Sequence, residues 1–544
     1  MRLVECVPNF SEGRDKNIIE SICDAIRKVK GVYLLDFDPG EATNRTVVTF
    51  VGEPEPVLEA AFQAIKKASE LIDMSKHKGA HARMGATDVC PFVPVSGVTV
   101  DDCVELSHRL GKRVGEELGI PVYLYEYAAT RPERKNLATI RKGEYEGLPE
   151  KLKDPEWKPD YGPAEFNARS GATVIGCREF LIAYNINLNT KDRKLAHEIA
   201  LNIREAGRAK RDKDGKIIRD EQGKAIKIPG IFKAVKAVGW YIEEYGLAQV
   251  SINFTNYKIS PPHLVFDECC RQAEKLGLRV TGSELVGLIP LEAILMAGRY
   301  YLRKQGKSPG VPEEELIEIA VRSLGLDQLY PFEPEKKIIE YTVAEKRRFE
   351  EMRLRGFVNE VSVDSPTPGG GSVAALLGSM AAALGSMVAN LSYKDDELMG
   401  EKGMELQRLK DEFLREIERD AQSFDAVIEA MRMKAKTEEA KKAKEEAIKN
   451  AYLGAARVPF QVMERIVETL KILEYIGEHG LTASISDVGV AARAALACGE
   501  GAYLNVLINL KEAEDRELRE RSEYLLSELR ERSELILKKV LEKI

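Results

Sequence analysis

The sequence lacks a dominant charge of one sign, since 81 Lys and Arg side chains stand against 88 Asp and Glu for a net charge of −7. A chain without a net positive field is not drawn to nucleic-acid phosphates or to an anionic membrane surface. Its first residues, MRLVECV, contain no basic segment followed by an apolar one, which argues against secretion. We therefore expect a cytoplasmic protein with neither a nucleic-acid nor a membrane partner.

Cysteine patterns that bind metal are also missing. The eight cysteines are irregularly spaced, with no Cys-x-x-Cys pair and no cysteine and histidine cluster at zinc-finger spacing. The sequence therefore predicts no metal site.

Glycine and proline are not in excess, and 544 residues are too many for one core, so two to four domains are expected.

One stretch, residues 373–391, lacks charge for long enough to cross a bilayer. It is rich in Ala, Gly and Ser rather than in Leu, Ile and Phe, which indicates a buried core helix rather than a membrane span. Gly378, Ala382 and Ser386 recur every four residues, so another helix could approach this one closely.

Strand and helix patterns alternate up to about residue 330. Strands that alternate with amphipathic helices predict an α/β domain whose sheet is covered by helices. In the first part the expected strands are Leu3–Val7, Val32–Phe37, Thr46–Val51, Val89–Val95 and Val122–Tyr125, and the expected helices are Ile18–Val29, Pro54–Met74 and Val100–Leu118.

The pattern then restarts in the order β-α-β-β-α-β, which is typical of a ferredoxin-like fold. We therefore predict two related ferredoxin-like subdomains, with an exposed β-ribbon inserted at residues 210–229. The second set comprises Phe180–Leu188, Asp192–Glu205, Val235–Ile242, Leu247–Phe254, Pro262–Leu276 and Val280–Ile289, followed by a helix at Leu291–Lys304.

Beyond about residue 340 the strand pattern disappears, and the remainder predicts an all-α domain. The expected domains are residues 1–178 and 179–328 (both α/β), a linker at 329–340, and a helical domain at 341–544. The expected helices are Glu345–Val361, Val373–Leu391, Met404–Met431, Thr437–Tyr475, Ser486–Ala497 and Tyr503–Lys543.

The loop Ser75–Asp88 holds two of the six histidines, His77 and His81, together with Arg83. An imidazole beside a cation can stay neutral and move protons near pH 7. A basic surface loop would show the same residues, so the sequence leaves both interpretations open.

Polar residues also lie near the ends of expected strands. Asp38 closes one expected strand and Asn44 precedes the next, where α/β sites commonly form, although turn chemistry explains most such residues. The segment Gly162–Thr173, GPAEFNARSGAT, opens the second subdomain in this interpretation and would be either a ligand-binding or an interdomain loop.

In the helical part, the run Gly369-Gly370-Gly371-Ser372 precedes a helix, and its backbone N–H groups would suit an anion or simply form a flexible turn. Asp420 falls on the apolar stripe of its helix, between Ile417 and Phe424. A carboxylate directed at a core should have a perturbed pKa, as at an active site or in a buried ion pair with Arg493.

Polar groups also interrupt two other apolar helix faces. Asp487 lies on a helix of small residues, and Asn505 and Asn509 are four residues apart on one face. Such groups need partners, which either the protein or a ligand could supply.

Taken together, the motifs resemble the formimidoyltransferase-cyclodeaminase family over the whole chain. The runs similar to its transferase half are VECVPNFSEGRD, TNRTVVTFVG, LIDMSKHKGAHARMGATDVCPFVPV, PVYLYEYAA, FLIAYNINL, GSELVGLIPL and LGLDQLYPF. The runs similar to its cyclodeaminase half are PGGGSVAA, SDVGVAA and AYLNVLINL.

The resemblance implies roles for particular residues. The family places its catalytic histidine in a Gly-x-His-Pro-Arg-Met-Gly pattern, which residues 79–85 match except for Ala82 in place of the proline, so His81 is implied as acid and base. Asp420 is implied as the cyclodeaminase base. The folate-binding segment implied is Gly162, Pro163, Ala164, Glu165, Phe166, Asn167, Ala168, Arg169, Ser170 and Gly171; Asp38, Asn44, Arg83, Gly369, Gly370, Gly371, Ser372, Asp487 and Asn505 are candidates for substrate contact.

The resemblance also implies the chemistry. The formimino group of N-formimino-L-glutamate would pass to tetrahydrofolate, which acts as a substrate and is expected to carry a polyglutamate tail. The product would then close to 5,10-methenyltetrahydrofolate with loss of ammonia, without a metal. A formyl donor for the first half, or a non-catalytic folate-binding scaffold, are the alternatives. Helical domains of this kind resemble dimer-formers, so a homo-oligomer built from dimers is expected.

Overall fold

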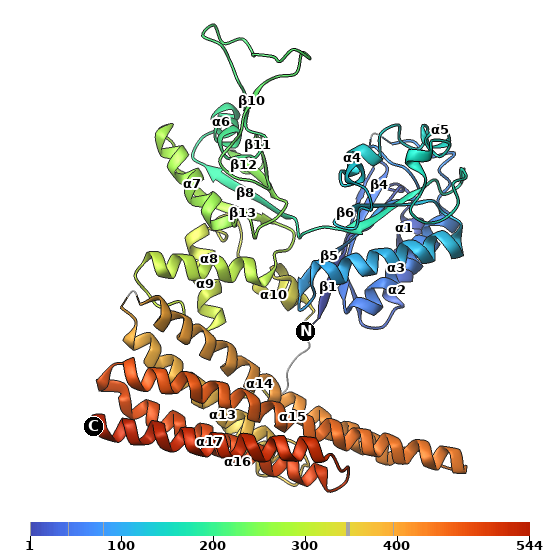
Figure 1. Cartoon of the computed structure of the whole chain (residues 1–544). Coiled ribbons are helices and arrows are strands. Elements are labelled where there is room, and N and C mark those ends of the chain that lie inside the picture. The colour runs from blue at the N-terminus through green and yellow to red at the C-terminus, as the bar shows by residue number, and fades with distance from the viewer. Residues whose placement is uncertain (1, 42, 80, 344–348, 395) are drawn as a thin grey trace. The chain divides into compact units, whose positions relative to one another are not determined.

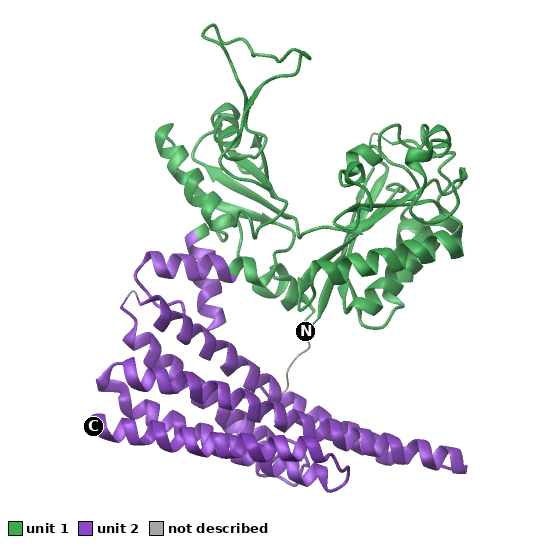
Figure 2. Cartoon of the chain, in the orientation of Figure 1, with its two compact units in different colours: residues 1–294, 324–344 green, residues 295–323, 345–544 purple. Residues whose placement is uncertain are grey.

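The computed structural model describes residues 2–41, 43–79, 81–343, 349–394 and 396–544. The chain divides into two compact units, residues 1–294 with 324–344 and residues 295–323 with 345–544 (Figure 2). All strands of the described residues lie in the first unit, and the second unit is helical. Residues 295–323, which the sequence places with the second α/β subdomain, are therefore grouped with the helices.

The first unit begins with a seven-stranded mixed sheet. Its strands are ordered β1-β4-β2-β5-β7-β6, with β3 pairing at the edge with β4; β7 pairs in parallel with β5 and β6, and the other pairs are antiparallel. The strands are β1 (Leu3–Cys6), β2 (Asn9–Phe10), β3 (Val32–Gly40), β4 (Arg45–Gly52), β5 (Thr87–Ser96), β6 (Val122–Glu126) and β7 (Thr173–Cys177).

Three helices cover one face of this sheet: α1 (Lys16–Arg27), α2 (Pro54–Leu71) and α3 (Val100–Leu118) (Figure 1). Alternate strand residues such as Val48 and Phe50 join the helices in one apolar core, as period-two alternation requires. The intervening residues of β4, beginning with Arg45, therefore face away from the helices. Short helices α4 (Leu137–Ile140) and α5 (Leu148–Lys151) follow β6.

A second sheet of four antiparallel strands follows in the order β11-β12-β8-β13. Its elements run β8 (Ile182–Leu188), α6 (Arg193–Ile203), β11 (Val235–Ile242), β12 (Leu247–Phe254), α7 (Pro262–Lys275) and β13 (Val280–Val286). The first four main strands of the first sheet have the equivalent order, β3-β4-β1-β5. After β13 come α8 (Leu291–Lys304), α9 (Glu313–Leu324), α10 (Pro334–Lys337) and α11 (Ile339–Thr342).

An arm projects from the second sheet between α6 and β11 (Figure 1). Its stem pairs β9 (Arg208–Ala209) with β10 (Lys227–Ile228). Beyond the stem, residues 211–218 and 219–226 form two similar turns, RDKDGKII and RDEQGKAI. Lys210, Ile218 and Ile226 close a ring of backbone hydrogen bonds of 2.7–2.9 Å, so the arm satisfies its own backbone.

The helical unit packs five long helices around one core. These are α13 (Gly370–Ser392), α14 (Glu397–Arg432), α15 (Glu438–His479), α16 (Ile485–Leu510) and α17 (Arg516–Lys543), and the shorter α12 (Leu354–Val361) precedes them. Among the described residues, α13 is the one helix long and apolar enough to cross a membrane, with a mean hydropathy of 1.7. It packs against α14 and α16 and is 61% buried, as expected for a core helix.

Several predicted boundaries are wrong. The predicted helices Ser486–Ala497 and Tyr503–Lys543 divide in the wrong place, because α16 continues through Gly499 and Gly501. A Cβ at Gly499 would lie 2.5 Å from Leu529 and one at Gly501 3.3 Å from Ala374, so these glycines permit close helix packing. Residues 345–348, the start of the predicted helix Glu345–Val361, lie outside the described residues.

Several elements that precede the helical domain were not predicted. Strand β7 was not predicted, and the segment Gly162–Thr173 leads into it, so this segment belongs to the first sheet rather than opening the second subdomain. Helix α9 was also missed. The predicted linker contains α10 and α11 and is attached to the α/β unit, where Leu291 donates its backbone N–H to Glu340 at 2.8 Å.

Candidate active sites

His81 lies in the loop between α2 and β5, half-buried, with both ring nitrogens engaged. Nδ1 is 2.6 Å from the carbonyl oxygen of Ala82, and Nε2 is 2.7 Å from Nη1 of Arg45. Because a carbonyl oxygen can only accept, Nδ1 carries the proton and the Nε2 lone pair accepts from the guanidinium. The ring is therefore held as the neutral tautomer that can take up a proton.

The surroundings of His81 keep it neutral. Burial and the nearby positive charge of Arg45 lower its pKa, and Arg141 acts in the same direction, against the Ala82 carbonyl and Asp88, which raise it. Asp88 is fully buried and accepts from Arg141 and from the backbone N–H of Met84 at 2.9 Å. A buried ion pair thus supports the loop beside the histidine.

Asp38 lies on the same face of the sheet as Arg45. It pairs with Val47 across β3 and β4, and cross-strand partners share a face. Burial lowers the pKa of Arg45, and the negative charge of Asp38 acts in the opposite direction. The structure therefore brings Asp38, Arg45 and His81 together on the face that α1–α3 leave uncovered.

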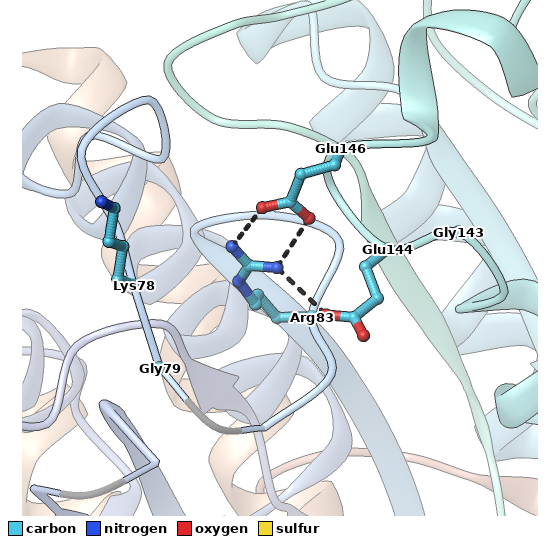
Figure 3. Close-up of a pocket in the computed structure, with 6 residues that line it drawn as sticks. All are labelled: Lys78, Gly79, Arg83, Gly143, Glu144 and Glu146. Carbon is cyan, nitrogen blue, oxygen red and sulfur yellow. Dashed lines mark hydrogen bonds and ion pairs between the residues drawn. The ribbon is translucent and has the colours of Figure 1, made fainter.

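Arg83, by contrast, is engaged within the protein (Figure 3). Its buried guanidinium donates to Glu146 at 2.7 and 2.9 Å, to Glu144 at 3.0 Å, and through Nε to Nδ1 of His77 at 3.2 Å. A hollow of about 450 Å³ is lined by Lys78, Gly79, Arg83, Gly143, Glu144 and Glu146. His81 is not among these residues, so the hollow lies on the Arg83 side of the loop.

Asn44 connects three turns. It is buried at a φ of +48°, accepts from the backbone N–H of Gly13 at 2.9 Å, and donates to the carbonyl of Lys78 at 3.1 Å. Its own carbonyl accepts from Nε2 of His77 at 2.8 Å. Since the oxygen and the nitrogen of its side-chain amide both bond within the protein, Asn44 positions the His81 loop.

The segment 162–171 runs beside that loop. Ser170 accepts from the backbone N–H of Ala86 at 2.8 Å, and Arg169 donates to the last carbonyls of α2, including that of Ser69 at 3.3 Å. The ring of Phe166 lies 5.4 Å from that of Tyr145. The C-terminal end of the segment is thus held by hydrogen bonds. Elsewhere in the segment, exposed side chains remain available to a ligand: Ala164, Glu165, Phe166 and Ala168.

In the helical unit, Asp420 meets the N-terminus of α13. The Ser372 hydroxyl donates to Oδ2 at 2.9 Å, and its backbone N–H also bonds to the carboxylate. Burial raises the pKa of Asp420, Ser372 lowers it, and the charge of Glu416 raises it, with a net upward shift. The anion at this helix end is therefore the side chain of Asp420.

The glycines at the start of α13 differ in how much space a Cβ atom would have. A Cβ on Gly371 would lie 2.1 Å from Oδ1 of Asp420, whereas one on Gly370 would lie 3.5 Å from the amide of Asn505, and one on Gly369 3.6 Å from a backbone oxygen. Gly371 thus allows the carboxylate to reach the helix, and Asn505 borders the same place.

Asp487 lies apart from this group. It is 18 residues before Asn505 on the continuous helix α16, a distance of about 27 Å at the usual rise. The alternative partner of Asp420, Arg493, instead pairs with Glu534 at 2.7 Å. Within one chain the structure brings together Gly370, Gly371, Ser372, Asp420 and Asn505, but not Asp487.

Sequence reasoning missed Arg141, Asp88 and the pair Glu144 and Glu146. Asp88 closes the loop itself, whereas Arg141, Glu144 and Glu146 reach it from a segment more than 50 residues further along the chain, which no spacing indicates. Arg45 stands at the start of β4, a position that alone does not single it out. Among the described residues no group of three or more His, Cys, Asp or Glu could hold a metal ion.

The chain is of the class that joins an α/β unit to a helical unit, and each unit holds a half-buried side chain, His81 or Asp420, that can exchange a proton. Residues 3–178 match the formiminotransferase domain, N-terminal subdomain; residues 183–344 match the formiminotransferase domain; and residues 353–527 match formiminotransferase-cyclodeaminase. Mouse formimidoyltransferase-cyclodeaminase is 44% identical over 536 residues, 97% of this chain and 96% of its own. The chain belongs to the formimidoyltransferase-cyclodeaminase family.

Relatives of each half are also known. Glutamate formimidoyltransferase of Streptococcus pyogenes serotype M1 is 43% identical over 302 residues, 56% of this chain and 94% of its own. The crystal structure of formiminotetrahydrofolate cyclodeaminase from Thermotoga maritima is 30% identical and covers 36% of this chain and 97% of that chain, with a TM-score of 0.32.

Proposed function

We propose that this chain catalyses two consecutive reactions on one folate. The first transfers the formimino group of N-formimino-L-glutamate to tetrahydrofolate, giving 5-formiminotetrahydrofolate and glutamate. The second closes that product to 5,10-methenyltetrahydrofolate and releases ammonia. The observation that carries the proposal is that each unit holds one partly buried proton-transfer group, His81 in the first and Asp420 in the second.

In the transferase step, N5 of tetrahydrofolate attacks the formimino carbon and forms a C–N bond. Neutral His81 takes the proton from N5 through Nε2 and returns one to the glutamate nitrogen as its C–N bond breaks. Arg45 must yield its contact with Nε2 as substrate enters. Asp38 on the same face would stabilise the positive charge that develops on the amidine.

The test is a His81→Ala variant with the helical unit as internal control. We expect transfer to fall by about 10²–10⁴-fold, the usual contribution of general acid–base catalysis, with cyclodeamination of supplied 5-formiminotetrahydrofolate unchanged. Normal transfer by His81→Ala would remove the assignment. A parallel assay with N-formylglutamate, followed by product analysis, distinguishes the formyl-donor alternative.

In the cyclodeaminase step, N10 attacks the carbon of the protonated formimino group, and Asp420 takes the N10 proton. The proton then passes to the departing nitrogen, the C–N bond breaks, and ammonia leaves the methenyl cation. An Asp420→Asn variant should accumulate 5-formiminotetrahydrofolate and glutamate without methenyl absorbance. Full activity of Asp420→Asn would contradict this role.

We further infer that the chain forms a homo-oligomer built from dimers through α13 and α16. These adjacent helices expose an apolar face, with Met380, Met387 and Leu391 on α13 and Leu504 and Ile508 on α16. A large exposed apolar patch is typical of a protein interface.

Light scattering on the double variant Met380→Glu, Met387→Glu tests the interface. We expect the molar mass to halve, whereas Leu541→Glu, an equally exposed apolar position on α17, should leave it unchanged. An unchanged mass in the double variant would show that this face is not the interface.

The remaining expectations belong to the same proposal. The segment 162–171 would bind the folate, which we expect to carry a polyglutamate tail. The chain would act in the cytoplasm, in histidine degradation and one-carbon metabolism. Both sheets would be variants of one ferredoxin-like plan, which their shared strand order supports.

A further inference from the structure

A second carboxylate lies beside Asp420 in the helical core. Glu416 is on α14, one turn before Asp420, and its side chain is almost completely buried. Residues four apart on a helix are neighbours on one face. Two acidic side chains therefore share the buried surroundings at this point of the helix.

Glu416 is paired with two arginines. Arg419 donates to Oε1 at 2.7 Å, and Nη1 of Arg465 on α15 lies 3.3 Å from the same oxygen. The other oxygen, Oε2, is buried and accepts no hydrogen bond from any described residue. A buried ion pair with an unsatisfied oxygen is a poor means of stabilising a fold, so its position next to Asp420 calls for another role.

The groups that face Asp420 can be assigned helix by helix. From α13, Ser372 donates its hydroxyl and backbone N–H; from α14, Glu416 supplies a negative charge. From α15, Arg465 reaches Glu416, and from α16 the uncharged Asn505 lies 3.5 Å from where a Cβ on Gly370 would be, at the same end of α13. The charged neighbour that acts on Asp420 is thus Glu416, which raises its pKa.

We propose that Glu416 is a positioning residue of the cyclodeaminase reaction, whose fixed negative charge strengthens Asp420 as the acceptor of the N10 proton. The inference rests on the proposed role of Asp420. Glu416 need not touch the folate: the proton moves from N10 to Asp420 and on to the departing ammonia. A stronger base takes the N10 proton more readily, which speeds the attack.

The chain supplies a matched control in Glu412. Glu412 lies on the same helix and binds the same arginine, accepting from Nε of Arg465 at 2.9 Å. It is two turns from Asp420, about 12 Å along the helix axis. Glu412→Gln therefore makes the same chemical change to the same ion-pair network without removing the charge next to Asp420.

The experiment is the pH dependence of kcat/KM for cyclodeamination of supplied 5-formiminotetrahydrofolate, in the full chain. Removing a charge one turn away should lower the pKa of Asp420, so Glu416→Gln should move the acid limb to lower pH. In the plateau the weaker base should cost about threefold in rate. Glu412→Gln should leave the acid limb in place.

The outcomes separate the two hypotheses. If Asp420→Asn is inactive but Glu416→Gln and Glu412→Gln have the same acid limb as the unmodified chain, Glu416 has no such role and Asp420 keeps its own. If Asp420→Asn remains active, the role of Asp420 itself fails. Should Glu416→Gln not fold, Arg465→Gln gives the test with the opposite sign: a less compensated Glu416 should move the acid limb to higher pH, and a limb that stays or moves down overturns the inference.

Discussion

Gly371 gives the sharpest prediction, because one added methyl group would strike the carboxylate of Asp420. A Cβ there would lie 2.1 Å from Oδ1 and 2.6 Å from Cγ of Asp420, where approaches under 3.0 Å are essentially never seen. Gly371→Ala must therefore displace the carboxylate by about 1 Å, and misplacement of that size can cost about 10²-fold in rate. We expect a loss of cyclodeaminase activity of that order and a destabilisation of about 1–3 kcal/mol from overpacking.

The assay compares Gly371→Ala with Gly370→Ala and uses the transferase half of each variant as the reference. A Cβ at Gly370 meets Asn505 at an ordinary 3.5 Å, and alanine is a better helix former than glycine by about 1 kcal/mol. Gly370→Ala should therefore keep both activities and unfold at the same or a higher temperature. Equal cyclodeaminase rates in the two variants would refute the contact between Gly371 and Asp420.

Three other predictions concern the protonation of each site and the arm. Arg45→Gln removes the cation that lowers the pKa of His81, so the acid limb of the transferase pH profile should move to higher pH. An unchanged acid limb would show that Arg45 does not set the pKa of His81. Ser372→Ala removes the donor that lowers the pKa of Asp420, and the acid limb of cyclodeamination should likewise move to higher pH, opposite to Glu416→Gln. Replacing residues 210–226 by an Asn-Gly turn should change the unfolding free energy by less than about 0.5 kcal/mol, as for surface changes, since the arm bonds to itself; thermal unfolding measures this.

The regular elements with clear local signals were predictable. Helix α3 has the bounds Val100–Leu118 that the sequence predicts, because Thr99 caps its start and Gly119, at a φ of +63°, ends it. Strands β11 and β12 also have their predicted bounds, on either side of a turn at Gly246. Strand β7 was missed because it is buried on both faces and its five residues show no alternation.

The candidate sites were predictable only in part. Asp420 could be found because a carboxylate on an apolar stripe is visible in a helical repeat. Its partner Ser372 reaches it only when α13 and α14 pack, whereas Glu416 lies one turn before it on the same helix and could have been found from the spacing. Near His81, Arg141 lies 60 residues further along the chain, and spacing along the chain cannot indicate such a contact.

The arm has a practical consequence for work on this protein. At the tips of its two turns, Gly215 and Gly223 have positive φ values, and no atom lies within 4 Å of where a Cβ would be. Foreign residues placed between these turns would meet solvent rather than the sheet. The arm is thus a suitable insertion site, where a peptide tag or a dye attachment could be added while both reactions are followed in the intact chain.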